Sequence, residues 1–166
     1  ISATETGGET ANDFRDQRQT LLQELTSLTG AAVREDPDGQ VNVSVGGLLL
    51  VGGARFASLQ SDTLNAAGLH TITYQTPDGL SYDATAQFTV GKMGSILNMR
   101  DVKTQDLIDR LDQFAKTLID EINAQHALGF DLTGAAGGDF FSSLATTTGA
   151  AANVRVDADR KSTRLN

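Results

Sequence analysis

Apolar side chains near the start of the chain recur with the spacing of one face of a helix. The positions lie four, three, four and three residues apart. Four of them are apolar, Phe14, Leu21, Leu25 and Leu28, and the fifth is Arg18. This is the seam of a heptad, and Leu22 widens the apolar stripe. Asn12 is a residue type that caps helix N-termini, and Gly30 stands where a helix commonly ends. The pattern predicts a helix over residues 11–29.

The apolar period changes from helical spacing to alternation in residues 30–90. Val41, Val43 and Val45 alternate with polar residues, which is typical of a half-buried strand. Gly46-Gly47 predicts a two-residue hairpin to the next strand, 48–51. The segments 36–39 and 76–79 both contain Pro-Asp-Gly, the composition of a tight turn. Further strands are predicted at 56–59, 71–75, 80–83 and 87–90, and together they form an antiparallel β lobe of about six short strands.

Helical spacing returns after Gly91. The apolar positions are Leu107, Leu111, Phe114, Leu118 and Ile122, and Gly129 is the predicted end. A continuous helix over residues 92–127 would be ~50 Å long.

These elements predict an α+β fold, in which two long helices pair antiparallel as a coiled-coil-like stalk and a small antiparallel β lobe is inserted between them. The expected divisions are a first stalk helix (1–30), the inserted β domain (31–90), the return stalk helix (91–130) and a loop and extended segment packing on the stalk (131–159). Two such helices leave apolar surface uncovered. Partner helices from further sequence or from neighbouring subunits are therefore expected.

Arg18 is the exception in the first apolar stripe. An arginine buried on a helix seam needs a carboxylate partner, which Asp109, Asp112 or Glu121 of the second helix could supply. Alternatively, its aliphatic stem lies along apolar surface while the guanidinium stays in water.

Composition excludes several classes of function. A net charge of −8 repels phosphate backbones, so nucleic acid is not an expected partner. The absence of cysteine excludes disulfides, thiolate metal sites and cysteine nucleophiles. No stretch reaches the roughly 20 apolar residues of a membrane-spanning helix. No signal-peptide pattern opens the chain. The chain begins at Ile1 rather than Met, in a polar stretch that runs to Glu9, so the native N-terminus is expected to be missing.

Candidate chemistry is sparse. His126, one of two histidines, is the best candidate for catalysis, but its position at a helix C-terminus favours a structural role. No nucleophile and base at interpretable spacing accompany it. Asp131, Thr133 and Asp139 surround a glycine-rich loop but lack the ligand spacing of a calcium loop. We expect no cofactor, no metal ion and no small-molecule substrate.

Four ordered segments resemble the flagellar hook-associated protein 1 family. The first is the helix start Asn12, Asp13, Phe14, Arg15, Asp16, Gln17 and Arg18; the second runs from Gly39 to Val51; the third runs from Gly91 to Arg100 and Asp101; the fourth comprises Asn123, His126, Gly129, Asp131, Phe140 and Phe141. The resemblance covers about residues 12–156. The last seven residues, 160–166, do not fit it and are interpreted as a non-native tail.

The resemblance implies a structural subunit of the extracellular bacterial flagellum with no catalytic residues. Such proteins form a ring of subunits at the hook–filament junction, where hook protein and hook-associated protein 3 are the neighbours, and they are exported unfolded through the flagellar channel. The alternatives are another axial protein such as flagellin or hook-associated protein 3, a coiled-coil adhesin with a β head, and a secreted enzyme that uses His126. The Arg-Asp-Gln-Arg helix and the paired phenylalanines argue against the other axial proteins.

Overall fold

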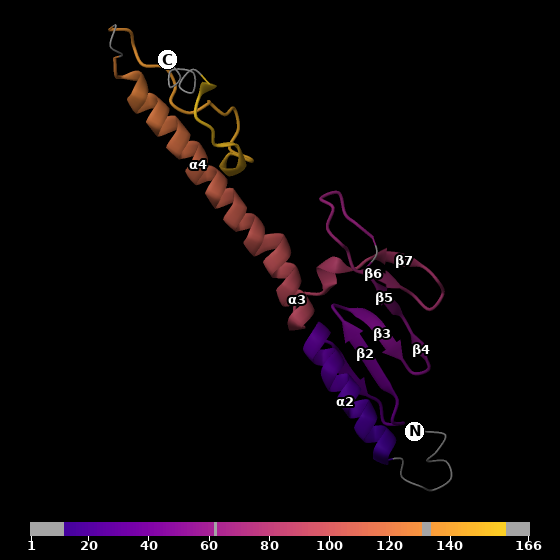
Figure 1. Ribbon diagram of the computed structural model, residues 1–166. Helices are drawn as coiled ribbons and strands as arrows, with labels where there is room; N and C mark the ends of the chain where they lie inside the picture. Colours follow the sequence, from indigo (N-terminus) through magenta and orange to yellow (C-terminus); the bar gives the residue numbers. More distant parts are fainter. Residues whose placement is uncertain (1–11, 62, 131–133, 159–166) are drawn as a thin grey trace. The chain divides into compact units, whose positions relative to one another are not determined.

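The computed structural model describes residues 12–61, 63–130 and 134–158 (Figure 1). The chain divides into two compact units, residues 1–100 and 101–166. Within the described ranges, the first unit contains one complete helix, two small sheets and the start of the second helical region. The second unit contains a long helix and the chain that follows it. The combination of helices and small antiparallel sheets is the predicted α+β class.

The first predicted helix is present as α2 (Asn12–Thr29). It ends at Gly30, whose φ of 70° lies in the left-handed region and whose N–H donates to the Thr26 carbonyl at 2.7 Å. Gly91, at the start of α3 (Gly91–Asn98), packs against this helix end. A Cβ at Gly91 would lie 2.6 Å from the Gly30 nitrogen, so α2 and α3 meet through two glycines.

Seven short strands form two antiparallel sheets in the first unit. The four-stranded sheet has the order β1 (Ala32–Glu35), β2 (Val41–Val45), β3 (Leu48–Gly52) and β4 (Arg55–Phe56). The three-stranded sheet has the order β5 (Ser58–Gln60), β6 (Thr73–Gln75) and β7 (Ser81–Asp83). Sequence alone missed β1, because all four of its residues are exposed and no apolar alternation marks them.

The predicted turns connect these strands. Gly46 and Gly47 form the β2–β3 turn with φ of 53° and 87°, values that a type I′ hairpin requires and glycine readily adopts. The two Pro-Asp-Gly segments form the β1–β2 and β6–β7 connections.

The strand predicted at residues 87–90 is wrong. Residues Thr85–Gln87 form a 3-10 turn instead, held by the Asp83 carboxylate, which accepts hydrogen bonds from the Thr85 N–H at 2.8 Å and the Thr85 hydroxyl at 2.6 Å. The Thr85 Oγ1 in turn accepts the Ile72 N–H at 2.8 Å. This turn directs Phe88, which is 2% exposed, into the core.

The core of the first unit lies between the sheets and the helices. Its fully buried members are Ala31, Val43, Val45, Leu50, Ile72, Tyr74, Ala84 and Phe88. Leu22 and Leu25 of α2 and Met93 and Leu97 of α3 pack against it. Burial raises the pKa of the Tyr74 phenol, and nearby Tyr82 adds to that rise. The Tyr74 hydroxyl donates to the Leu49 carbonyl at 2.7 Å.

The return helix is not uniform. After α3, residues Met99–Lys103 form a π-helical turn (η2), and α4 (Thr104–Ala127) follows. The boundary between the two units falls inside η2, after Arg100. The guanidinium of Arg100 donates to the His70 carbonyl at 2.7 Å and so holds the end of this region to the β lobe. The apolar spacing of the sequence does not reveal a π turn. Such a turn shifts the backbone hydrogen bonds by one residue, and no particular residue type marks it.

The chain after α4 folds back along that helix (Figure 1). It contains a bridge between Phe141 and Val156 and a short 3-10 helix, η3 (Ala151–Asn153). Ser142 and Asp157 extend the bridge through bonds to the carbonyls of Arg155 and Phe140. Among the residues of this unit that the structure describes, the buried apolar ones are Ala115, Ile119 and Ala150.

Candidate helix-packing site

Helix α4 has one covered face and one exposed apolar face. The covered face consists of Asp112, Ala115, Ile119 and Asn123, which are buried and lie three, four and four residues apart. A different stripe carries Leu107, Leu111, Phe114 and Leu118, which are all exposed. The chain's own C-terminal segment covers the first face and leaves the second available for packing.

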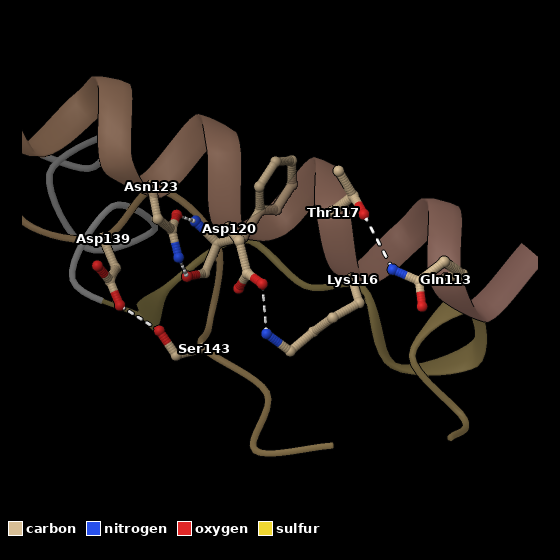
Figure 2. Close-up of polar contacts among 8 residues, drawn as sticks. Gln113, Lys116, Thr117, Asp120, Asn123, Asp139 and Ser143 are labelled. Atoms are coloured by element: carbon tan, nitrogen blue, oxygen red, sulfur yellow. Dashed lines mark hydrogen bonds and ion pairs between the residues drawn. The ribbon is translucent and has the colours of Figure 1, made fainter. Parts of the chain in front are cut away.

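Asn123 fastens the paired phenylalanines to the covered face. Figure 2 shows its side-chain amide directed at the segment that follows α4. Its Oδ1 accepts the N–H groups of Phe140 at 2.9 Å and Phe141 at 2.8 Å, and its Nδ2 donates to the Phe141 carbonyl at 2.9 Å. The amide is 7% exposed, so these bonds satisfy groups that burial would otherwise penalise.

His126 holds the loop one turn further along the helix. Its Nδ1 lies 2.7 Å from the Gly138 carbonyl, which can only accept, so this nitrogen carries the proton. The imidazole ring lies 5.8 Å from the Phe140 ring. A Cβ at Gly137 would lie 2.3 Å from the His126 carbonyl, so the loop approaches the helix too closely for a larger residue. These contacts assign His126 to loop docking.

Asp112 also attaches the C-terminal segment to α4, a role that the sequence did not indicate. Its carboxylate is 5% exposed and accepts the N–H of Gly149 at 2.5 Å and of Ala151 at 2.9 Å. It therefore secures the start of η3 to α4. The only local signal was an acidic residue off the apolar stripe, which is also the signature of an ordinary solvated position.

The structure brings together most of the last predicted motif. Asn123 contacts Phe140 and Phe141, and the Phe140 ring also lies against His126. The two phenylalanine rings meet edge to face, with centroids 4.9 Å apart. The Gly129 carbonyl accepts the Gly137 N–H at 2.8 Å and closes the same loop. Asp131 and Thr133 lie outside the described residues. Asp139 accepts a hydrogen bond from the Ser143 hydroxyl (Figure 2).

The predicted packing residues of α2 divide into two groups. Leu25 is partly buried and packs against the core of the first unit, together with Leu22. Phe14, Leu21 and Leu28 are exposed. On α4, Ile122 is partly buried, whereas the other four predicted positions are exposed. The antiparallel pairing of the two helices stays a prediction.

Arg18 binds a carboxylate within its own unit. Its guanidinium donates to the Glu35 carboxylate of β1 at 2.8 Å and to the Gly39 carbonyl at 3.1 Å. The side chain therefore ties α2 to the first hairpin, and its pairing with Asp109, Asp112 or Glu121 of the second helix stays a prediction. Both charged groups retain solvent access, with side-chain exposures of 27% and 48%, so the pair contributes at most about 1 kcal/mol.

The remaining motif residues lie on helix surfaces. The exposed first turns of α2 contain Asn12, Asp13, Arg15, Asp16 and Gln17. The Thr20 hydroxyl donates to the Asp16 carbonyl there. Asp101 is exposed within η2.

The described ranges contain no cluster of three or more histidine, cysteine, aspartate or glutamate side chains that could hold a metal ion. In the same ranges, no helix combines the length and apolarity needed to cross a membrane.

Comparison with known proteins identifies the family. The family model described as the flagellar hook-associated protein FlgK helical domain matches residues 1–141. The chain belongs to this family. Flagellar hook-associated protein 1 of Salmonella typhimurium strain LT2 is 29% identical over 138 residues, which cover 81% of this chain and 25% of that protein. The protein of the same name from Escherichia coli strain K12 is 30% identical over 139 residues, with the same coverage.

A solved structure has a similar fold. The flagellar hook junction protein FlgK from Burkholderia pseudomallei matches with a TM-score of 0.63 and 25% identity, over 85% of this chain and 27% of that one. The chain thus spans about a quarter of the length of the relatives it matches. The resemblance noted in four sequence segments is confirmed at the level of the family.

Proposed function

We propose that the chain is part of a structural subunit of the bacterial flagellum, which lies at the hook–filament junction, is required for filament assembly and has no catalytic activity. Family membership over residues 1–141 supports this role. The relatives that cover most of this chain carry the name of a hook-associated protein, and the matching structure that of a hook junction protein. Because the chain spans about a quarter of their length, the role is proposed for the full-length protein.

The observation that carries the proposal is the uncovered apolar stripe of α4. Leu107, Leu111, Phe114 and Leu118 are exposed on a helix whose other face is already covered by its own chain. A continuous apolar stripe with heptad spacing is a surface for helix packing rather than for catalysis. Phe14, Leu21 and Leu28 provide a second such stripe on α2.

The partners we propose follow from the family resemblance. They are further copies of the same protein in a ring, the hook protein and hook-associated protein 3. The net charge of −8 disfavours nucleic acid. We propose that the full-length protein is exported unfolded through the flagellar channel and functions outside the cell.

Deletion of the full-length gene in a motile host tests the role. We expect cells that build hooks but no filaments and that do not swim, with both properties restored by the full-length gene. Electron microscopy and a swimming assay provide the measurements. Normal filaments in the deletion strain would contradict the proposal.

Complementation with variants then tests the stripe. A full-length protein carrying Leu111→Ser and Phe114→Ser should be secreted but should not support filament assembly, because serine removes the apolar packing surface. Gln113→Ser with Thr117→Ser is the matched control, since both residues are exposed and lie on the same turns of α4. Equal swimming by the two double variants would exclude this stripe as the assembly surface.

A further inference from the structure

Two hairpins of the first unit are joined by the same turn. The β1–β2 connection contains Asp36-Pro37-Asp38-Gly39-Gln40, and the β6–β7 connection contains Thr76-Pro77-Asp78-Gly79-Leu80. In each turn the glycine N–H donates to the carbonyl of the first residue at 2.9 Å, and the N–H of that first residue donates to the carbonyl of the fifth at 2.8 Å. The glycines have φ of 78° and 86°. Both aspartates are exposed, so water reaches both turns.

The turns differ in what holds the aspartate side chain. Both carboxylate oxygens of Asp38 are engaged by Gln40, whose N–H donates at 3.2 Å and whose Nε2 donates at 2.7 Å. At the equivalent position Leu80 has no side-chain donor, and its N–H donates instead to the Thr76 hydroxyl at 3.0 Å. Within the described part of the chain, the Asp78 carboxylate has no hydrogen-bond or ion-pair partner. Rotation of the Asp38 carboxylate therefore breaks two hydrogen bonds, whereas rotation of the Asp78 carboxylate breaks none of those in the structure.

We propose that the Asp78–Gly79 peptide is a site of spontaneous isomerisation to isoaspartate. The Gly79 backbone nitrogen attacks the Asp78 Cγ, loses its proton and forms a new N–Cγ bond, while one carboxyl oxygen leaves as water. The product is a five-membered succinimide. Addition of one water to the Cγ carbonyl restores aspartate, and addition to the main-chain carbonyl yields isoaspartate, so the chain's mass does not change and no oxidant or reductant is consumed.

The hydrogen bonds of Gln40 make succinimide formation slower at Asp38 than at Asp78. Attack requires the carboxyl group to swing toward the nitrogen of the following residue, and glycine offers no side chain to hinder it. For Asp38 this rotation first breaks the contacts with Gln40. We expect isomerisation at Asp78 to be faster than at Asp38 by at least about fivefold, the factor that corresponds to the net strength of one hydrogen bond.

Isomerisation inserts a methylene into the backbone of the β6–β7 turn. The turn bonds between Thr76, Gly79 and Leu80 then no longer match the hairpin register. Strand pairing at this end of the three-stranded sheet should be lost in the modified molecules. Pairing next to the β1–β2 turn should be lost more slowly, because isomerisation at Asp38 is slower.

Ageing of the intact chain in heavy-oxygen water at mildly acidic pH tests the proposal, because a carboxyl oxygen must carry a proton to leave as water. Each succinimide that reopens takes up one heavy oxygen, so peptide mapping by mass spectrometry counts events at Asp78 and Asp38 in the same sample. An isoaspartate-specific methyltransferase reports the rearranged product. Equal labelling at the two aspartates would overturn the inference.

Exchange of the fifth turn residue provides the matched test. Leu80→Gln should slow labelling at Asp78 by about the same factor, whereas Gln40→Leu should raise labelling at Asp38 by that factor. Leu80→Ala is the control, because it changes the side chain without adding a donor and should leave the Asp78 rate unchanged. Both positions are exposed turn residues, and circular dichroism verifies that the sheets are retained in all three variants. If Leu80→Gln and Leu80→Ala label Asp78 at the same rate, the proposed cause is wrong.

Discussion

Single polar side chains attach the C-terminal segment to α4. Asn123 and Asp112 are both buried, and each places its oxygen atoms against backbone N–H groups of the chain that folds back. A buried amide or carboxylate is costly unless its hydrogen bonds are made, so each residue favours one position of the segment over others. At this scale, polar contacts determine where the segment docks, and the apolar Ile119 and Ala150 fill the space between.

Asn123→Ala should loosen this docking strongly. The change leaves the N–H groups of Phe140 and Phe141 without their acceptor, and we expect a loss of about 3 kcal/mol in the free energy of unfolding of the second unit. Amide hydrogen exchange at Phe140 and Phe141 measures the effect directly. Gln113→Ala is the control, since its bond to Thr117 is exposed and its loss should cost less than about 0.5 kcal/mol (Figure 2). Unchanged exchange at the two phenylalanines would contradict this role.

Asp83 should make the first unit sensitive to acid. Hydrogen bonds from the Thr85 hydroxyl and N–H lower the pKa of Asp83 below its ordinary value of 3.8. The stabilisation is therefore complete above that value and is lost as the pH falls through the lowered pKa. Asp83→Asn should be less stable than the parent chain at neutral pH, with the difference vanishing in strong acid. Urea unfolding across this pH range provides the measurement, and a difference that is independent of pH would exclude the mechanism.

At the scale of elements, α2 uses a narrower face than its apolar pattern suggests. Leu22 and Leu25 contact the core of the β lobe, whereas Phe14, Leu21 and Leu28 face away from it. Arg18 extends the contacting face by binding Glu35 on β1. One helix stripe therefore serves two surfaces, the core of its own unit and an uncovered face.

Leu25→Ala and Leu21→Ala should differ in how much they lower the free energy of unfolding, because the two leucines lie on different faces of α2. Leu25 lies against the core, so its truncation should lower the free energy of unfolding by about 1–2 kcal/mol through lost apolar burial. Leu21 is 65% exposed, and the same truncation there should change stability by less than about 0.5 kcal/mol. Urea unfolding of both variants compares the faces. Equal losses would mean that the two leucines are buried to the same extent.

At the scale of the whole molecule, the exposed apolar stripes and the net charge of −8 have opposite effects on the association of copies of the chain. Uncovered stripes favour association, whereas like charge on every copy disfavours it. Salt screens the repulsion and leaves apolar burial intact.

The isolated chain should therefore associate more strongly as salt is raised. Sedimentation across a series of salt concentrations gives the measurement. The variant carrying Leu111→Ser and Phe114→Ser should associate less than the parent chain at every salt concentration, because it keeps only the α2 stripe, and its melting temperature should be unchanged because both side chains are already exposed. Association that weakens with salt would indicate that charge pairs, not the stripes, hold the copies together.

The sequence by itself determined the elements whose signals are local. Helical spacing predicted α2 and most of α4, alternation predicted β2, and the glycine and proline positions predicted the hairpin turns, because each of these depends on residues within one turn or one strand. Ordered motifs also indicated the family, which the comparisons confirm. Tertiary structure alone decided that Arg18 binds Glu35, that Asp112 accepts from Gly149 and Ala151, and that Thr85 replaces the last predicted strand by a 3-10 turn. These pairings join residues far apart in the sequence, or depend on a neighbouring strand, and no local period encodes which distant backbone group a buried polar side chain will meet.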